Sequence, residues 1–222
     1  SAAPELFGAK TFANRLKAAG ILASIGHSDA SCSCALASVE WGFRHITHLY
    51  SCMSSVHRIN GYRRGGVVEA AFLNDAITVE IIADGAHLPP ELLRLVYQVK
   101  GADKIALITD SMRGAGMPEG PSVLGCISDG LPVIVEDGVA KLEDRSAFAG
   151  SVATCDMLVK NMVQLANVPL PAAIQMASQT PAAILGLTKK GKIQAGFDAD
   201  IVILDKALNV RKTFVGGKVV YA

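Results

Sequence analysis

Charged and aromatic side chains are scarce in this chain of 222 residues. Asp, Glu, Lys and Arg make up 18% and aromatic residues 5%, whereas apolar residues make up 50%. The formal net charge of +1 gives no electrostatic reason to expect a nucleic acid or an anionic membrane surface as a partner. A mean hydropathy of +0.35 is high for an independent soluble domain. We therefore expect either a chain that is buried on many faces or one whose natural covering includes further polypeptide.

Long apolar runs and an export signal are also lacking. Lys, Asp, Glu or Arg interrupts every apolar run well before the ~20 residues that a membrane-spanning helix needs. The segment Ser1–Glu5 has no basic stretch followed by an apolar one, so it does not read as a signal peptide. The five cysteines are odd in number, which suits reduced thiols better than a disulfide framework. These features predict a cytoplasmic protein that contacts no membrane.

Four short apolar runs end on a residue that can bind a metal or move a proton. The four terminal residues are His27, His48, His87 and Asp110. Helices are predicted before and between the runs, at residues 10–19, 30–41, 67–73 and 89–99, and Ser28 or Asp29 can cap the second of them. A long loop is predicted at residues 51–66, and two further helices at 151–166 and 171–185. Alternation of strand and helix predicts parallel strands joined by right-handed crossovers. The carboxyl ends of parallel strands share one edge, and barrel enzymes draw their catalytic residues from that edge.

The fold class that follows is α/β, with a sheet of parallel strands. Only four strand–helix units are visible, and a complete eight-stranded barrel needs about twice that number. Residues 1–187 are assigned to this α/β portion, with a β-hairpin insertion at about 118–148 whose turn is marked by Asp137 and Gly138. Residues 188–222 are predicted to form a small β unit of short strands with glycine turns.

The residues at the strand ends suit hydrolysis assisted by a metal ion. Neutral imidazoles at His27 and His48, on neighbouring strands, can hold a zinc-like ion through ring nitrogens at ~2.0–2.1 Å. Catalytic zinc usually has three protein ligands, so two histidines are one ligand short. Such an ion lowers the pKa of bound water to about 7, and Asp110 is placed to take the proton and pass it to a leaving group. His87 can orient a substrate or polarise a carbonyl.

Each of these residues also has a purely structural interpretation. A lone histidine at a strand end is commonly a hydrogen-bonded structural residue, and metal binding is one of several uses. Asp110 taken by itself could cap a helix or anchor a loop. Asp84, which precedes Gly85, is better explained as an Asx-turn carboxylate, and His45 and His57 are assigned to a strand edge and a loop. The coincidence of four polar residues at equivalent strand ends favours a catalytic rim.

The strand ends and the segment after the predicted hairpin contain five short motifs, which are Gly26-His27-Ser28-Asp29-Ala30, Thr47-His48-Leu49-Tyr50, Ile82-Ala83-Asp84-Gly85-Ala86-His87, Ile108-Thr109-Asp110-Ser111-Met112 and Ala149-Gly150-Ser151. In this order along the chain, they resemble the motifs of N-acetylglucosamine-6-phosphate deacetylases. The segment from Gly191 to Val202 resembles the closing segment of the wider amidohydrolase superfamily. The resemblance spans nearly the whole chain.

The resemblance implies a fold, a reaction and a set of site residues. The family is a (β/α)8 barrel with a small β-sandwich. The resemblance implies that residues 1–187 supply the second half of the barrel and residues 188–222 supply strands of the sandwich. The family removes acetyl groups from amino-sugar 6-phosphates with a divalent metal, for which we expect Zn2+ with Fe2+ as the alternative. Metal ligation falls to His27 and His48, and the acid/base role to Asp110. Substrate contacts fall to His87, Ser51, Cys52, Phe148, Ala149 and Gly150.

The family also uses an arginine, often from a partner subunit, against the sugar phosphate. Arg58, Arg63 and Arg64 compete for this role, because a planar guanidinium suits bidentate phosphate binding. At least two of the three are then solvated loop charges. We expect a small-molecule amino-sugar phosphate as ligand, and a homodimer or a complementing chain as partner.

Two departures from the family pattern bear on substrate and metal. Residues 50–53 read Tyr-Ser-Cys-Met where the family commonly has asparagine-alanine-methionine, so a hydroxyl replaces an amide that helps to hold the sugar. The family's glutamate metal ligand belongs to an upstream Glu-Gly-Pro motif that these residues lack, and Glu5 matches a different family position. A half barrel leaves two unpaired sheet edges. The chain alone is therefore predicted to be inactive or weakly active unless another chain or a second copy completes it.

Two alternative functions stay open at this point. One is a non-catalytic fragment or pseudoenzyme that binds sugar phosphate without metal. The other keeps the amidohydrolase superfamily but changes the substrate to a cyclic amide or a nucleobase.

Overall fold

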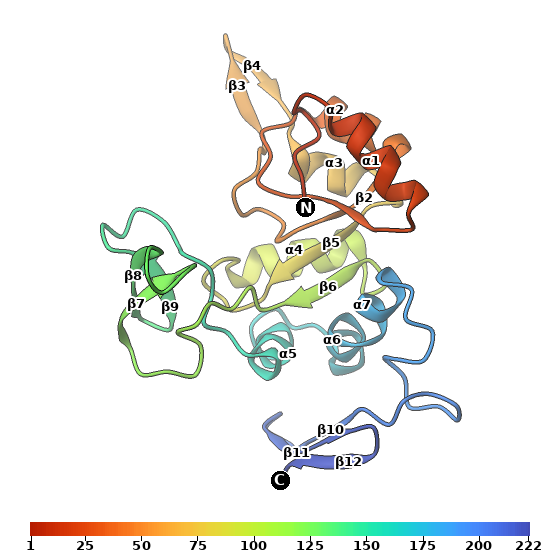
Figure 1. The fold of residues 1–222 in the computed structure, drawn as a ribbon, viewed down its shortest axis with the longest axis vertical. Helices are drawn as coiled ribbons and strands as arrows, with labels where there is room; N and C mark the ends of the chain where they lie inside the picture. The colour runs from red at the N-terminus through yellow and green to blue at the C-terminus, as the bar shows by residue number, and fades with distance from the viewer.

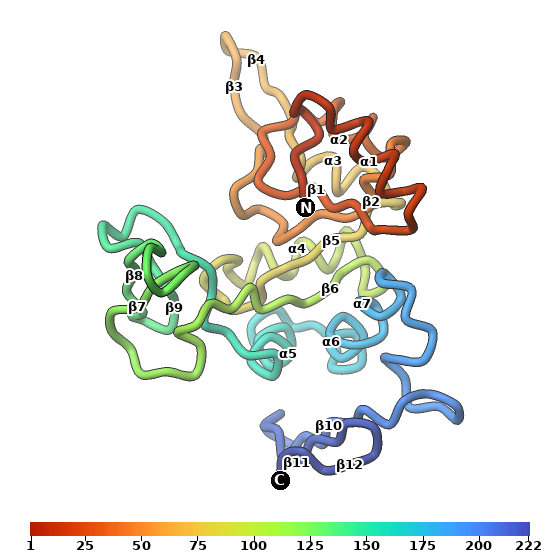
Figure 2. Tube along the Cα trace, viewed as in Figure 1, coloured from red at the N-terminus to blue at the C-terminus, as the bar shows by residue number.

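The computed structural model describes residues 1–222 and has α/β elements in the centre with small antiparallel sheets around them (Figures 1 and 2). The helices are α1 Ala9–Ala18, α2 Cys32–Trp41, α3 Val67–Leu73, α4 Pro90–Lys100, α5 Cys155–Gln164, α6 Leu170–Ala177 and α7 Gln179–Ile184. The strands are β1 Ala23–Ile25, β2 Phe43–Ile46, β3 His57–Ile59, β4 Tyr62–Arg64, β5 Thr78–Ile82, β6 Ile105–Ile108, β7 Gly120–Leu124, β8 Leu131–Glu136, β9 Val139–Leu142, β10 Ile201–Leu204, β11 Val210–Val215 and β12 Lys218–Tyr221.

The central sheet has the strand order β1-β2-β5-β6, and all of its neighbouring pairs are parallel. Helix α2 connects β1 to β2, α3 lies between β2 and β5, and α4 connects β5 to β6. The predicted parallel crossovers are therefore confirmed. Because all four strands run the same way, His27, His48, His87 and Asp110 follow strands that end at one edge of this sheet.

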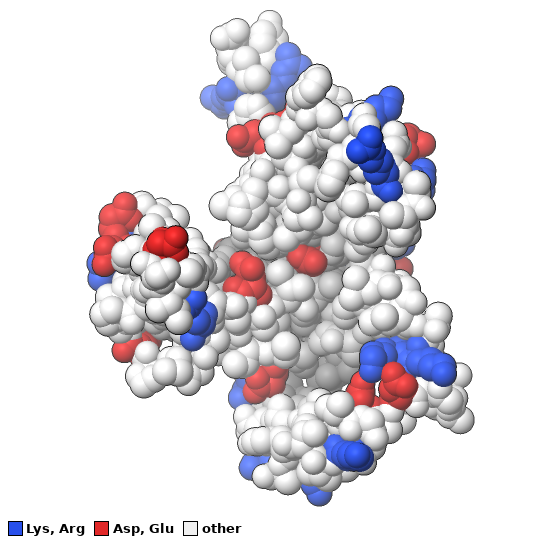
Figure 3. All heavy atoms as spheres, viewed as in Figure 1, with Lys and Arg blue, Asp and Glu red and all other residues white.

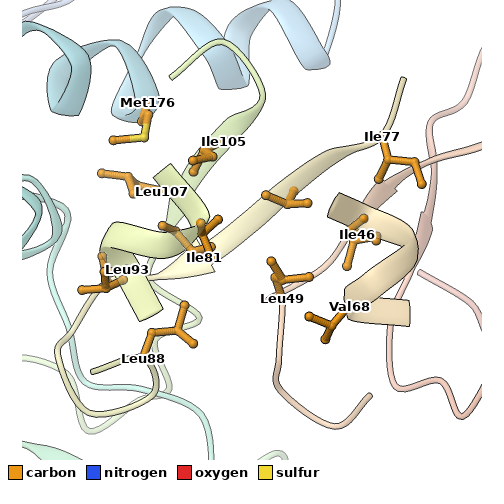
Figure 4. Packing of buried hydrophobic residues seen from close by; sticks show 14 of the residues in the cluster. Ile46, Leu49, Val68, Ile77, Ile81, Leu88, Leu93, Ile105, Leu107 and Met176 are labelled. Carbon is orange, nitrogen blue, oxygen red and sulfur yellow. The ribbon is translucent and has the colours of Figure 1, made fainter. Parts of the chain in front are cut away.

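One face of the sheet packs on helices and forms the main core, a cluster of 30 buried residues. In Figure 4, Ile46 and Leu49 approach Val68 of α3, while Ile105 and Leu107 of β6 approach Met176 of α6. Burying a side chain of this size contributes about 1.5–3 kcal/mol. The strands that carry the polar end residues are thus fixed from the helical side.

The opposite face of the sheet is polar along β2 and β5. Successive side chains in a strand point to opposite faces, so the burial of Val79 and Ile81 in the core places Thr78 and Glu80 on the other face. Thr78 and Glu80 both contact His45 of β2. This polar face lies beneath the rim at which the strands end.

The two outer strands of the central sheet, β1 and β6, differ in how their free sides are covered. At the β1 edge, the backbone of Ala2 forms a parallel bridge with Ile25, with hydrogen bonds to Ser24 and Gly26. No strand pairs with the outer edge of β6. One of the two expected open edges is therefore partly covered by the chain itself.

Three local predictions were wrong. Residues 51–66 were expected to be an irregular loop but contain the antiparallel hairpin β3–β4, with positive φ at both Asn60 and Gly61. The cap of α2 is Ser31, whose Oγ accepts from the Cys34 N–H, rather than Ser28 or Asp29. The segment 171–185 was expected to be one helix, but it is divided at Ser178 into α6 and α7.

The remaining strands form two small antiparallel sheets. The hairpin expected at Asp137 and Gly138 is β8–β9, and β7 adds a third strand that was not predicted. Strands β10, β11 and β12 form the last sheet, and it exposes apolar side chains including Val202, Val219 and Val220. None of the helices combines the length and the apolar character that crossing a bilayer requires.

Candidate metal and substrate site

The backbone is left-handed at three of the four strand-end residues. The angle φ is 51° at His27, 32° at His48 and 48° at Asp110. Positive φ is uncommon for residues other than glycine, and it persists only where the surrounding structure fixes it. Such residues concentrate at functional sites. The same unusual conformation on three strands of one sheet singles out this rim.

The imidazoles of His27 and His48 meet at the rim. Their Nε2 atoms are 3.0 Å apart, and the ring centroids are 4.9 Å apart with the planes tilted by 52°. Two ligand nitrogens of a tetrahedral zinc ion, each ~2.0–2.1 Å from the metal, lie about 3.3 Å from each other. The two nitrogens therefore converge at nearly the separation that a shared ion requires. Without an ion, one ring must donate its Nε2–H to the other ring.

His48 is the buried member of this pair. Its side chain is 6% exposed, and its Nδ1 atom is buried without a hydrogen-bond partner. His27 is exposed. Within the chain, no third His, Cys, Asp or Glu joins the pair in a cluster that could hold a metal. The residues fit two positions of a three-ligand site.

His87 is held in a fixed orientation by Asp84. The Oδ1 atom of Asp84 accepts from the backbone N–H groups of Ala86 and His87 at 2.9 and 2.8 Å, which is an Asx-type turn as predicted. Its Oδ2 atom accepts from Nδ1 of His87 at 2.6 Å, and the two side chains are only 3% and 8% exposed. Since Nδ1 carries the donated proton, Nε2 of His87 is the nitrogen left for a substrate.

The environment keeps Asp84 ionised. Burial by itself raises the pKa of the Asp84 carboxyl group, but hydrogen bonds from the His87 side chain and from the backbone of His87 and Ala86, together with the His87 charge, lower it below its usual value of 3.8. The carboxylate therefore stays a hydrogen-bond acceptor at neutral pH. An ionised acceptor at Nδ1 fixes the tautomer of the imidazole.

Asp110 and the segment 148–151 are joined by backbone hydrogen bonds. The Ser151 N–H donates to the Asp110 carbonyl at 2.9 Å, and the Met112 N–H donates to the Ser151 carbonyl at 2.8 Å. The Asp110 side chain is exposed, and no hydrogen bond or ion pair within the chain engages its carboxylate. Phe148 lies against His87, with ring centroids 4.8 Å apart. The structure thus brings Phe148, Ala149 and Gly150 between the ends of β5 and β6.

Ser51 and Cys52 lie between the ends of β1 and β2. The Ser51 N–H donates to the His48 carbonyl at 2.9 Å, and the Ser28 N–H donates to the Cys52 carbonyl at 3.1 Å. The loop that carries them therefore returns from His48 to the residue next to His27. Glu5 stabilises the segment that follows His27, because its carboxylate accepts from the Ser28 hydroxyl and the Asp29 N–H.

The arginines are not brought to this rim. Arg58 and Arg63 face each other across the hairpin β3–β4, and both are exposed, as is Arg64. The hairpin projects from the body of the protein, and Figure 3 shows Lys and Arg gathered at it. A cavity of about 440 Å3 at its base is lined by Asp29, Ser54, Ser55, Val56 and His57. None of the four strand-end residues lines that cavity.

Sequence reasoning missed two features near the site. His45 was assigned to a strand edge, but its ring is 4% exposed and contacts Thr78 and Glu80. The hairpin was missed although Asn60-Gly61, flanked by Ile59 and Tyr62, is a strong hairpin signal. Periodicity alone could not find the first. Thr78 lies opposite His45, and Glu80 comes two residues later on the same face, so both contacts depend on the register of β2 and β5.

Comparison with known proteins gives a consistent assignment. Residues 5–220 match the amidohydrolase family. The chain is 39% identical over 217 residues to an N-acetylglucosamine-6-phosphate deacetylase of Lysinibacillus sphaericus, covering 98% of this chain and 54% of that protein. It is 36% identical to the deacetylase of Vibrio furnissii, covering 99% of this chain and 53% of that protein. The chain thus spans about half the length of the curated relatives it matches.

Solved structures agree on the fold. A point mutant of the Mycobacterium smegmatis N-acetyl-D-glucosamine-6-phosphate deacetylase, in complex with N-acetyl-D-glucosamine-6-phosphate, superposes with a TM-score of 0.91 at 32% identity, covering 99% of this chain and 56% of that one. The Thermotoga maritima deacetylase superposes with a TM-score of 0.89 at 36% identity, covering 99% and 58%. These neighbours have the (β/α)8 barrel fold, so the predicted partial barrel is confirmed.

Proposed function

The chain belongs to the amidohydrolase family, and we propose that it carries the metal-binding and proton-transferring residues of an N-acetylglucosamine-6-phosphate deacetylase. The reaction is hydrolysis of the acetamide of an amino-sugar 6-phosphate, which gives acetate and the free amine. The observation that carries the proposal is the 3.0 Å approach of the His27 and His48 Nε2 atoms at the rim where His87 and Asp110 also end their strands. The identity to deacetylases over nearly the whole chain supports the substrate class.

His27 and His48 would hold a divalent ion, with Zn2+ proposed and Fe2+ as the alternative. Such an ion, when bound, polarises a carbonyl oxygen and acidifies a water. A catalytic zinc site usually has three protein ligands, and the two imidazoles supply only two of them. No third His, Cys, Asp or Glu of this chain lies close enough to complete the set. A second polypeptide segment therefore completes the site, either in a homodimer or in a complementing chain.

Asp110 moves the proton in this proposal. Its carboxylate has no partner within the chain, and its backbone is fixed by Ser151, so it is free to accept the proton of the attacking water. The water oxygen bonds to the acetamide carbon, the carbon–nitrogen bond breaks, and Asp110 returns the proton to the departing amine. The left-handed backbone at Asp110 keeps this carboxylate at the rim.

His87 assists by orienting the substrate. Asp84 accepts from the Nδ1–H of His87, so the ring presents Nε2 toward the substrate. In this tautomer Nε2 is a hydrogen-bond acceptor, which suits a hydroxyl or N–H group of the amino sugar. Phe148, against the same ring, limits the rotation of the imidazole and covers this part of the site.

The sugar and phosphate contacts are proposed with one change from the family pattern. Ser51 and Cys52 follow His48 in the sequence. Ser51 offers a hydroxyl where deacetylases commonly have an amide, so the sugar preference can differ. Arg58, Arg63 and Arg64 stand on a hairpin that projects away from the rim, which supports phosphate binding in the site of a partner rather than in the same chain.

Complementation tests the proposed function. The 222-residue chain is mixed with the part of the Lysinibacillus sphaericus deacetylase that it does not match, and acetate release from N-acetylglucosamine-6-phosphate is measured with Zn2+ or Fe2+. We expect weak or no release from the chain alone and metal-dependent release from the mixture. A mixture with His48→Asn should stay inactive, whereas His57→Ala should behave as the unchanged chain.

Other outcomes separate the alternative functions. Release of ammonia from cyclic amides or nucleobases, without acetate from the amino sugar, would assign a different amidohydrolase. Thermal stabilisation by the sugar phosphate without metal uptake or turnover would assign a non-catalytic binder.

A further inference from the structure

The polar face of the central sheet holds a hydrogen-bonded pair, the buried His45 and the partly buried Glu80, directly below the rim. His45 lies on β2 three residues before His48, and its ring is 4% exposed. Its Nε2 is 2.9 Å from Oε1 of Glu80 on the neighbouring strand β5, and its Nδ1 is 2.7 Å from Thr78 Oγ1. The proposed function uses neither His45 nor Glu80.

The hydrogen bonds around His45 fix which atoms donate. The Thr78 hydroxyl proton is directed to the Arg44 carbonyl at 3.2 Å, so its oxygen accepts from the Nδ1–H of His45. One proton then lies between Nε2 of His45 and Oε1 of Glu80. Glu80 is thereby held at one oxygen, and its second oxygen, Oε2, has a fixed direction.

That second oxygen accepts from the backbone N–H of His48. The distance from His48 N to Glu80 Oε2 is 3.4 Å, and the next N–H, of Leu49, donates to the Glu80 carbonyl at 2.8 Å. One residue of β5 therefore receives two consecutive backbone donors at the point where the chain turns out of β2. His48 is the middle of this turn and has a φ of 32°.

The His48 ring has no hydrogen bond to orient it from its far side. Histidines that ligate a metal almost always donate their other ring N–H to a carboxylate, a carbonyl or a water. Nδ1 of His48 is buried without a partner. The flanking side chains, Ile46 and Leu49, point into the core beside Val68 (Figure 4). The direction of the imidazole is thus set by the backbone at His48. The Glu80 carboxylate is the group that accepts from the backbone N–H of His48.

We propose that Glu80, locked by His45, is a positioning residue that sets His48 in the metal site through its main chain rather than through its ring. This inference rests on the proposed metal-binding role of His27 and His48. In other metal sites, a carboxylate orients the histidine ligand by accepting from its ring N–H. Here Glu80, on the polar face of the sheet, has this orienting role through the backbone N–H of His48.

Three variants separate positioning from packing. Glu80→Leu removes the acceptor for the His48 N–H and leaves Nε2 of His45 unpaired. The double variant His45→Phe with Glu80→Leu replaces both partners of the hydrogen bond by apolar side chains, which restores stability when a polar pair is removed as a unit. Glu80→Gln keeps an acceptor oxygen for the His48 N–H and offers its NH2 group to His45. Glu143→Gln, at an exposed glutamate, is the matched control.

The readout is the affinity of the 222-residue chain for Zn2+, measured by competition with a chromophoric chelator, beside the thermal unfolding of the metal-free protein. We expect Glu80→Leu and the double variant to bind Zn2+ about 10–100-fold more weakly, which is the range for loss of the groups that orient metal ligands. Glu80→Gln and Glu143→Gln should stay within about threefold of the unchanged chain. The double variant should unfold at a higher temperature than Glu80→Leu while binding Zn2+ no better.

Recovery of Zn2+ affinity in the double variant together with its stability would overturn the inference, because it would show that the pair contributes packing alone. Loss of affinity in Glu80→Gln equal to that in Glu80→Leu would also overturn it. A failure of the proposed function looks different. If the unchanged chain bound Zn2+ normally but its complemented form released no acetate, the deacetylase assignment would fall and the positioning of His48 would stand. An unchanged chain that binds no Zn2+ would remove both.

Discussion

The Nε2 atoms of His27 and His48 lie 3.0 Å apart although 21 positions separate the two residues in the sequence. Parallel pairing of β1 with β2 creates this contact, since Ile25 lies opposite Ile46 and the two histidines follow these residues by two positions each. The separation suits two ligands of one ion.

Removal of the buried imidazole should abolish metal binding. His48→Asn is the suitable change, because asparagine tolerates the left-handed backbone that His48 adopts. We expect Zn2+ affinity to fall by at least about 100-fold, since only one histidine of the pair remains. The measurement is metal content after dialysis against buffered Zn2+. His57→Ala, on the exposed hairpin, should leave metal content unchanged, and retention of one Zn2+ per chain by His48→Asn would place the metal elsewhere.

Asp84 should make the stability of the chain depend on pH in the acid range. The pKa of Asp84 is lower in the folded chain than its ordinary value of 3.8. Its contribution is therefore fully present above pH 3.8 and is lost as the pH falls through the lower, folded-state pKa. Asp84→Asn should lack this acid-range slope and cost about 1–3 kcal/mol of unfolding free energy at neutral pH. Urea unfolding at a series of pH values measures both effects, and an unchanged slope in Asp84→Asn would contradict the assignment.

A side chain at Gly150 should displace the backbone that carries Asp110. The φ of Gly150 is 70°, and an added Cβ would lie 3.2 Å from the Asp110 carbonyl oxygen. Gly116 has a similar φ of 75° with open space around it, so Gly116→Ala measures the backbone strain alone. Gly116→Ala should cost about 1–2 kcal/mol. Gly150→Ala should cost more and should also lower acetate release in the complemented enzyme, because it displaces the strand end that carries Asp110. Equal effects of the two changes on turnover would argue against that role.

The buried Lys100 should make the stability of the chain rise with pH in the alkaline range. Its buried ammonium group donates to the carbonyls of Ala71 and Asn74 at 2.8 and 3.0 Å, at the end of α3. Burial is the main cause that lowers the pKa of Lys100 below its usual 10.5. The unfolded chain thus binds more protons between the lowered pKa and 10.5, so stability rises with pH across that window.

The comparison that isolates this effect is Lys100→Met against Lys206→Met, an exposed lysine. Lys100→Met should lose the alkaline rise and leave two carbonyl groups at the end of α3 without their donor, at a cost of about 1–3 kcal/mol. Lys206→Met should keep the rise. Unfolding free energies between pH 7 and 10.5 measure the difference.

Sequence reasoning predicted the central elements because their signals are local. Apolar runs that stop at His27, His48 and Asp110 mark strand ends, and their parallel order follows from the helices between them. The convergence of the first two residues at one rim follows from that topology. Their roles as ligands and as proton carrier stay predictions until metal binding and turnover are measured.

The features that the sequence did not predict depend on register and backbone conformation. The pairing of His45 with Glu80 requires β2 and β5 to align as they do, and residue patterns do not specify that alignment. Left-handed φ values at histidine and aspartate are likewise not encoded by residue type, as they are at glycine. Asp84 was correctly assigned to a turn, but the hydrogen bond between its Oδ2 atom and Nδ1 of His87 could be identified only from the structure.

The most direct test of the metal site is anomalous X-ray scattering from crystals of the 222-residue chain grown with Zn2+. The account predicts one strong peak at the rim, ~2.0–2.1 Å from the Nε2 atoms of both His27 and His48. A peak bound to only one of these histidines, or zinc located elsewhere with the two rings still hydrogen-bonded to each other, would contradict it.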